Sequence, residues 1–209
     1  MINDRIQWGK KFLQIFFSQE FFFGSQRVKG LEFLGKKLKR LVSLKSLNLA
    51  LVDCPADLHE GFVNLGKAIG GLISLESLNI EIPPDVRCLE IGESFKSLKK
   101  LKTLSLRFSQ VENQGFYEFS EGLKELELLE NVNIDFSDCS EMTDQSLGSV
   151  IQALSKCRNM KEFSVNFSYC EKITDIGLES ISETIKNFTS LTLKNDKFIK
   201  IKQKLFGPR

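Results

Sequence analysis

The sequence predicts an α/β fold, a curved solenoid in which short parallel strands alternate with helices. Five segments of eleven residues carry apolar or nearly apolar residues at positions 1, 4, 7, 9 and 11; they begin at Leu41, Leu72, Leu98, Leu126 and Cys157. A stripe of apolar residues with helical spacing leads into each segment. The strand positions return every 26 to 34 residues, and a period of this length is typical of repeat architectures.

Positions 7, 9 and 11 predict a strand in each segment, because apolar residues alternate there with other residues. An earlier triplet, Leu13, Ile15 and Phe17, lacks the preceding frame and is interpreted as a degenerate first repeat. The triplets of the complete segments are Leu47, Leu49 and Leu51; Leu78, Ile80 and Ile82; Leu104, Leu106 and Phe108; Val132, Ile134 and Phe136; and Phe163, Val165 and Phe167. Because positions 7, 9 and 11 share a face, the phenylalanines at position 11 are interpreted as core rather than as an exposed stripe.

A helix is predicted ahead of each strand, because apolar residues spaced 3, 4 and 3 apart lie along one helical face. The six stripes are Leu31, Leu34, Leu38 and Leu41; Phe62, Leu65, Ile69 and Leu72; Cys88, Ile91, Phe95 and Leu98; Phe116, Phe119, Leu123 and Leu126; Leu147, Val150, Leu154 and Cys157; and Leu178, Ile181, Ile185 and Phe188. A helix in this place also supplies the crossover that two parallel strands need.

Residues 12–193 are expected to form six to seven repeat units, with an N-terminal extension at 1–11 and a basic C-terminal tail at 194–209. The tail carries six lysines and arginines against one aspartate, which is more typical of a solvated segment than of an anion-docking one. The register after Ile185 is ambiguous, because Leu191 and Leu193 fit a strand only if three residues are missing from the frame. We expect the array to fray there.

Two stretches that follow strands carry a family resemblance. Residues 170–178 read CEKITDIGL, and residues 139–147 read CSEMTDQSL, with Ser146 where the first stretch has glycine. Together with the LxxLxL strands, they resemble the ribonuclease-inhibitor-like and cysteine-containing leucine-rich repeats over roughly residues 12–193. The resemblance implies parallel strands on a concave side and helices on a convex side. Such folds host receptors, inhibitors, ubiquitin-ligase substrate adaptors and GTPase activators alike.

Catalytic and metal-binding chemistry is not expected. The chain has five cysteines without a CxxC pair, and His59 is its one histidine, so neither a zinc site, a disulfide framework nor a histidine-based catalytic centre is indicated. Three cysteines follow strands at equivalent places and two occupy helix core positions; all five, Cys54, Cys88, Cys139, Cys157 and Cys170, are interpreted as structural. Thr143 and Thr174 are interpreted as helix N-caps. We therefore expect a binding protein, not an enzyme, without cofactor.

The even positions of the strands are expected to form the concave face. The candidate partner-binding residues there are Asn48, Asn79, Glu81, Thr103, Ser105, Arg107, Asn131, Asn133, Asp135, Glu162, Ser164 and Asn166. Neighbouring strands lie about 4.8 Å apart, so Glu81, Arg107 and Asp135 are expected to form a row of alternating charge. Two interpretations stay open for this row, lateral pairing that keeps the sheet soluble and recognition of a partner.

The function predicted from these patterns is a protein-binding scaffold or adaptor that acts through the concave face. A regulator of GTPases, with Arg107 as the residue to watch, and a ubiquitin-ligase substrate adaptor are alternatives from the resembled family. A structural fragment of a longer chain, or self-stacking through uncapped ends, is another. The formal charge of +2 and the interrupted apolar stretch from Phe12 indicate neither a nucleic-acid nor a membrane partner. A cytoplasmic location is expected, and a nuclear one is left open.

Overall fold

Strands and helices alternate in chain order in the computed structural model, which describes residues 6–8, 12–17, 27–51, 59–81, 89–108, 113–186 and 198–202. The strands are β1 (Ile6–Trp8), β2 (Phe12–Phe17), β3 (Ser46–Leu51), β4 (Ser77–Glu81), β5 (Thr103–Arg107), β6 (Asn131–Asp135), β7 (Glu162–Asn166) and β8 (Phe198–Lys202). The helices are α1 (Arg27–Leu38), α2 (His59–Gly70), α3 (Leu89–Phe95), α4 (Asn113–Leu123), α5 (Asp144–Leu154) and α6 (Asp175–Lys186).

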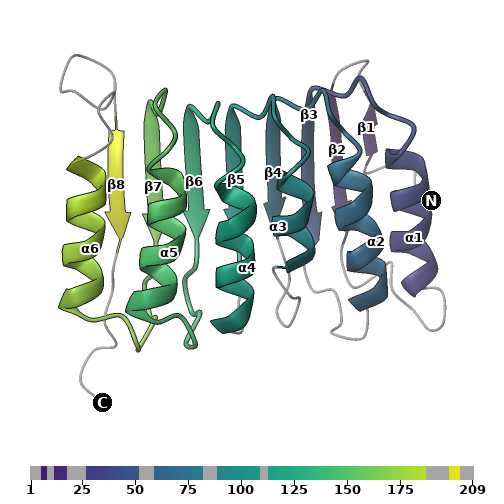
Figure 1. Cartoon of the computed structure of the whole chain (residues 1–209). Helices are drawn as coiled ribbons and strands as arrows, with labels where there is room; N and C mark the ends of the chain where they lie inside the picture. Colours follow the sequence, from purple (N-terminus) through teal and green to yellow (C-terminus); the bar gives the residue numbers. More distant parts are fainter. Residues whose placement is uncertain are drawn as a thin grey trace.

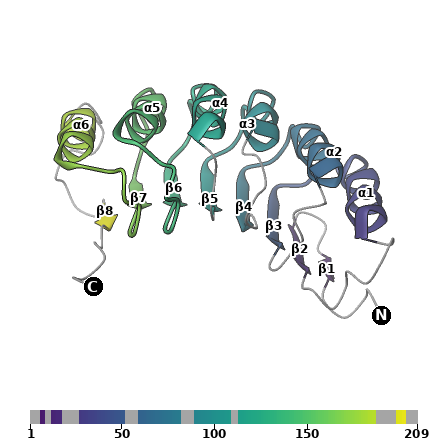
Figure 2. The same cartoon turned by 90° about the horizontal axis from the view of Figure 1, so that it is seen from below.

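The strands form a single sheet in which spatial order follows chain order from β1 to β8. β1 pairs antiparallel with β2, and every pairing from β2 to β8 is parallel. Figure 1 shows the helices side by side in front of the sheet. In Figure 2 the helices form the outer side of an arc and the strands form its inner, concave side. The α/β class with helices alternating with parallel strands is thereby confirmed.

The predicted inward residues of the strands are buried. In β5, Leu104 and Leu106 are at most 1% exposed, and positions 7 and 9 of β3, β4, β6 and β7 are buried in the same way. Position 11 is buried too, as Phe108 and Phe136 show, but β5, β6 and β7 end one residue before it. The longer strand expected there is wrong for these three.

Two of these strands end where a polar side chain at position 10 accepts a hydrogen bond from a backbone amide of the following turn. The Ser137 amide donates to Asp135 Oδ1 at 2.9 Å, and the Ser168 amide donates to Asn166 Oδ1 at 3.1 Å. Such local bonds compete with the ladder of the sheet. The amide of Phe136 still donates to the Asn166 carbonyl at 2.7 Å, so position 11 stays held against the sheet.

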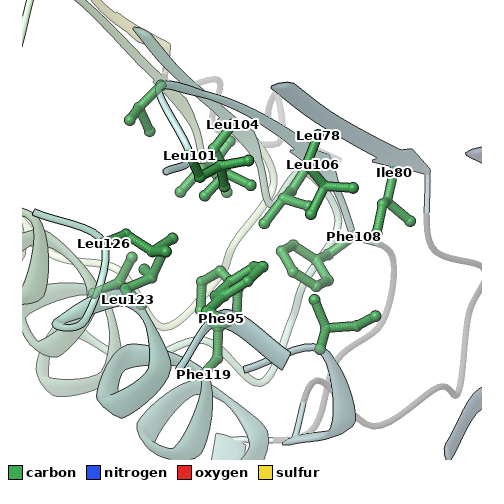
Figure 3. Close-up of a cluster of buried hydrophobic side chains, with 14 of the residues drawn as sticks. Leu78, Ile80, Phe95, Leu101, Leu104, Leu106, Phe108, Phe119, Leu123 and Leu126 are labelled. Carbon is green, nitrogen blue, oxygen red and sulfur yellow. The ribbon is translucent and has the colours of Figure 1, made fainter. Parts of the chain in front are cut away.

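Phenylalanines fill the space between the sheet and the helices. The Phe119 ring of α4 lies 5.7 Å from the Phe95 ring of α3 and 5.1 Å from that of Phe108, edge to face in both cases. Phe108 stacks on Phe136 with centroids 5.3 Å apart. Figure 3 shows Phe95, Phe108 and Phe119 together, between leucines from the strands and from the helices. The helical stripes predicted from the sequence are buried or partly buried wherever the structure describes their side chains.

Helices α3 and α4 approach each other most closely through glycine. A Cβ added to Gly122 would lie 2.0 Å from the carbonyl oxygen of Gly92, and one added to Gly92 would lie 2.8 Å from the Cα of Phe119. Both distances are far below van der Waals contact, so a side chain at either position forces the two helices apart.

The described cysteines are buried, as the structural interpretation requires. Cys139, Cys157 and Cys170 are buried and are not joined in disulfides. The thiol of Cys170 donates to the Phe136 carbonyl at 3.2 Å, and that of Cys157 donates to the Leu126 carbonyl at 3.3 Å. Burial raises the pKa of Cys157 and of Cys170 to about 12, so both stay protonated near neutral pH. Cys54 and Cys88 lie outside the described residues.

The N-caps are also observed, and that of α6 contacts the preceding repeat. Thr143 and Ser146 form a reciprocal capping box at the start of α5. At the start of α6, the Thr174 hydroxyl and amide donate to the Asp144 carboxylate at 2.6 and 2.8 Å. Gly177 occupies the place equivalent to Ser146, and a Cβ there would lie 2.4 Å from Asp144 Oδ1. The capping box therefore explains why position 146 is a serine. The contact with Asp144 explains why the equivalent position, 177, is a glycine.

Both ends of the sheet extend beyond the array expected from the sequence. β1 lies within residues 1–11, which were expected to be an extension, and β8 lies within 194–209, which were expected to be a tail. β8 continues the parallel register, with Phe163 opposite Ile199 and Val165 opposite Ile201. The excess of lysine obscured the alternation FIKIK at 198–202, which is itself a strand pattern. Residues 187–197, including Phe188, Leu191 and Leu193, lie outside the described part of the chain.

Candidate binding surface on the concave face

All twelve candidate residues lie on β3–β7 and belong to three columns that cross the sheet. The parallel register places positions 6, 8 and 10 of each strand opposite the same positions of the next. In the position-8 column, for example, Asn48 is opposite Asn79, Asn79 opposite Ser105, and Ser105 opposite Asn133. These side chains alternate with the buried ones and are partly or fully exposed. The structure therefore brings the candidate residues together on one surface.

Amide side chains join neighbouring strands across this surface. Asn79 Nδ2 donates to Asn48 Oδ1 at 3.0 Å, and Asn133 Nδ2 donates to Ser105 Oγ at 3.3 Å. In the position-6 column, Asn131 Nδ2 lies 3.4 Å from the Thr103 hydroxyl. A primary amide has two N–H donors and a carbonyl acceptor, so each of these asparagines keeps further capacity for a ligand.

The position-10 column contains the predicted row of alternating charge, which we call the concave triad: Glu81, Arg107 and Asp135. Arg107 Nη1 lies 3.5 Å from Glu81 Oε1, and Arg107 Nε lies 3.9 Å from Asp135 Oδ2. Both distances exceed the roughly 2.7–3.2 Å of a good N–H···O hydrogen bond. Asp135 is tied more firmly on its other side, where Asn166 Nδ2 donates to Oδ1 at 3.0 Å. The Arg107 side chain is 59% exposed and is held loosely between two carboxylates.

Two adjoining hollows lie over these columns. One, of about 340 Å³, is lined chiefly by the concave triad and the asparagines of the position-8 column. The other, of about 450 Å³, lies over positions 6 to 8 of β5–β7, with Asn131, Glu162 and Ser164 among its lining residues. Ser105 and Asn133 line both hollows, so the two form one trough that runs diagonally across the sheet.

A second charge row was not predicted. It occupies position 5, just before each strand, and we call it the rim row: Lys45, Glu76, Lys102, Glu130 and Lys161. Lys45 Nζ lies 2.5 Å from Glu76 Oε1, and Lys161 Nζ lies 2.5 Å from Glu130 Oε2. The signal was present in the aligned segments, where lysine and glutamate alternate at position 5 without exception. It was missed because binding residues were expected only at the outward positions within the strands.

The rim row shifts the pKa values of its carboxylates. The hydrogen bond from Lys45 lowers the pKa of Glu76 below its ordinary value, and the bond from Lys161 does the same for Glu130. A charge-assisted bond favours the ionised carboxylate. Four of the five rim-row residues therefore form short contacts between neighbouring repeats, while Lys102 lies 3.8 Å from Glu76.

The concave surface offers hydrogen-bonding and charged side chains, and none of its twelve candidate residues is a histidine or a cysteine. Over the described ranges, no three histidine, cysteine, aspartate or glutamate side chains gather as metal ligands would. None of the described helices has the length and apolar character to cross a membrane. His59 is the first residue of α2. Comparison with known proteins finds neither a family model nor a curated protein that matches this sequence.

Proposed function

We propose that the chain is a leucine-rich-repeat-type solenoid that binds a protein partner through the concave face of β3–β7. The arrangement of the elements supports the solenoid. A doubly wound α/β fold carries helices on both faces and reverses its strand order at a switch point. Here the strand order follows the chain, and the helices lie on one face (Figure 2). The buried cysteines after β6 and β7 support the cysteine-containing type of repeat.

The observation that carries the binding proposal is the open trough over the concave columns. Its polar side chains contact one another across neighbouring strands, and the described helices all lie on the opposite face of the sheet (Figure 2). Extended concave surfaces of this kind are the usual binding surfaces of solenoid proteins. Arg107 lies between two carboxylates in the middle of the sheet, which makes it a poor candidate for an arginine that inserts into a GTPase.

Affinity capture with matched variants tests the proposal. Proteins are captured on the intact wild-type chain, on the triple variant Asn79→Ala, Arg107→Ala, Asp135→Ala, and on a control triple, Glu93→Ala, Lys96→Ala, Gln152→Ala. The control residues are exposed but lie on the helical side. We expect partners that the wild type and the control retain and the concave variant loses, with binding weakened at least tenfold in a purified pair. Equal affinity of all three chains for every captured partner would refute the concave site.

A further inference from the structure

The ion pairs of the concave triad are longer than the two short ion pairs of the rim row. In the rim row, lysine and carboxylate lie 2.5 Å apart at Lys45–Glu76 and at Lys161–Glu130, so the groups satisfy one another. In the concave triad, both separations of Arg107 from its neighbours are 3.5 Å or more. A ligand can therefore bond to the triad without first breaking a short ion pair.

The concave face is acidic between β3 and β7. Its charged side chains are those of Glu81, Asp135 and Glu162 against Arg107, so positions 6, 8 and 10 carry a net charge of −2 in a chain of formal charge +2. Glu162 is exposed and forms no ion pair with any residue that the structure describes. The register places Lys200 of β8 opposite Ser164 of β7.

The two acidic ends of the trough are separated by a span that suits a short extended peptide. The triad lies over β4–β6 at position 10, and Glu162 lies on β7 at position 6. With strands about 4.8 Å apart and residues about 3.3 Å apart along a strand, Glu81 and Glu162 are separated by roughly 20 Å. An extended chain of about six residues covers this distance.

We infer, building on the concave binding site proposed above, that the trough takes an extended basic segment of a partner protein. One basic side chain of the segment lies between Glu81 and Asp135, and a second, five or six residues away, pairs with Glu162. The backbone between them passes over Ser105 and Asn133, where small polar side chains leave room and offer hydrogen bonds. An acidic segment fits less well, because Arg107 has a carboxylate on either side.

Selection from a displayed library of random decapeptides tests this inference on the full chain. We expect enrichment of lysine or arginine pairs five or six residues apart. In fluorescence anisotropy, Glu81→Lys and Glu162→Lys are expected to weaken the binding of the enriched peptides at least tenfold. Salt at 0.5 M is expected to weaken this binding as well. Glu183→Lys is the matched control, since Glu183 is an exposed carboxylate on α6. Glu81→Gln serves as a milder variant, and thermal unfolding shows that each variant is folded.

Arg107→Ala provides a test of sign. This substitution removes the one positive charge of the triad, so the affinity for a basic peptide is expected to rise about two- to fivefold. An acidic peptide held by the guanidinium would instead lose its binding. Weaker binding of the enriched peptides to Arg107→Ala, or no enriched peptide at all, overturns the inference.

Ser105→Tyr separates the failure of this inference from the failure of the concave site itself. It fills the junction of the two hollows. If the library returns acidic or apolar peptides that Ser105→Tyr blocks, the basic segment is wrong and the concave site stands. If the enriched peptides bind Ser105→Tyr and the charge variants as they bind the wild type, both proposals fail.

Discussion

The two faces of the central strands are built from alternate residues of the same backbone, yet they are used in opposite ways. On the helical side, Leu104 and Leu106 of β5 are almost completely buried and Phe108 joins a cluster of rings. On the concave side, Arg107 of the same strand is 59% exposed and makes two long ion pairs. The helical side therefore supplies the cohesion of the repeats, while the concave side is free to change with little cost to the fold.

Thiol reactivity should show the largest difference between the faces. In a background with Cys54→Ser and Cys88→Ser, the described cysteines are all buried. With a pKa of about 12, Cys157 and Cys170 have almost no thiolate at pH 8, so a disulfide reagent attacks them about a thousandfold or more slowly than a cysteine introduced by Ser105→Cys. The release of the reagent's chromophore measures both rates. Rapid labelling of the folded background would contradict the buried assignment.

The same thiols predict a loss of stability in alkali. Their pKa values are raised on folding from the ordinary 9.0 to about 12, so their contribution is complete below pH 9. It is lost as pH rises from 9 toward 12, because the unfolded thiol ionises first. Urea unfolding at pH 8 and pH 10 measures this trend, and Cys157→Ala is expected to flatten it.

Truncation of a core ring should have the largest effect on the free energy of unfolding. Phe119 contacts the rings of Phe95, Phe108 and Phe136, so Phe119→Ala is expected to cost about 3–5 kcal/mol. Phe33 of α1 is 54% exposed, and Phe33→Ala is expected to cost about 0.5 kcal/mol. Urea denaturation measures both. Similar losses for the two variants would mean that the ring cluster is not the core.

The rim row should respond to pH in the acid range. Lys45→Met removes the bond that lowers the pKa of Glu76, so this pKa is expected to rise toward its ordinary value. Because the folded pKa is depressed, the contribution of the pair is present above the ordinary value of 4.5 and is lost as pH falls through the folded pKa. NMR titration of the Glu76 carboxyl follows the change. Lys67→Met, at an exposed position of α2, is the control and should leave the Glu76 pKa in place.

The concave triad should contribute least to stability. Exposed ion pairs are worth about 0–1 kcal/mol, and those of Arg107 are long, so Arg107→Ala is expected to change the free energy of unfolding by less than about 0.5 kcal/mol. The same variant is expected to strengthen the binding of a basic peptide about two- to fivefold. Urea denaturation and a binding titration on one preparation measure both quantities. A large loss of stability would assign the triad to the fold instead of to binding.

Much of the fold could be predicted because the same pattern of apolar residues recurs in every repeat. Leu47, Leu78 and Leu104 share one position, and each is buried as the alternation requires. The row of Glu81, Arg107 and Asp135 was also predictable, because a parallel register carries equal positions into line. The β8 strand was missed because its lysines were interpreted only as the charge of a tail. The alternation of apolar and charged residues in this segment was overlooked. The rim row was missed because it lies one residue before the strand.

The sequence by itself determined which residues are buried and which columns they form, since the periods of a strand and a helix depend only on local backbone geometry. Tertiary structure decided how closely equal positions approach one another. Lys45 and Glu76 form a 2.5 Å contact, whereas Arg107 stays 3.5 and 3.9 Å from its neighbours, although both rows alternate in charge. Tertiary structure also decided where the concave side is hollow. Side-chain conformation and the curvature of the sheet determine the space above the strands, and neither follows from the periodicity of the sequence.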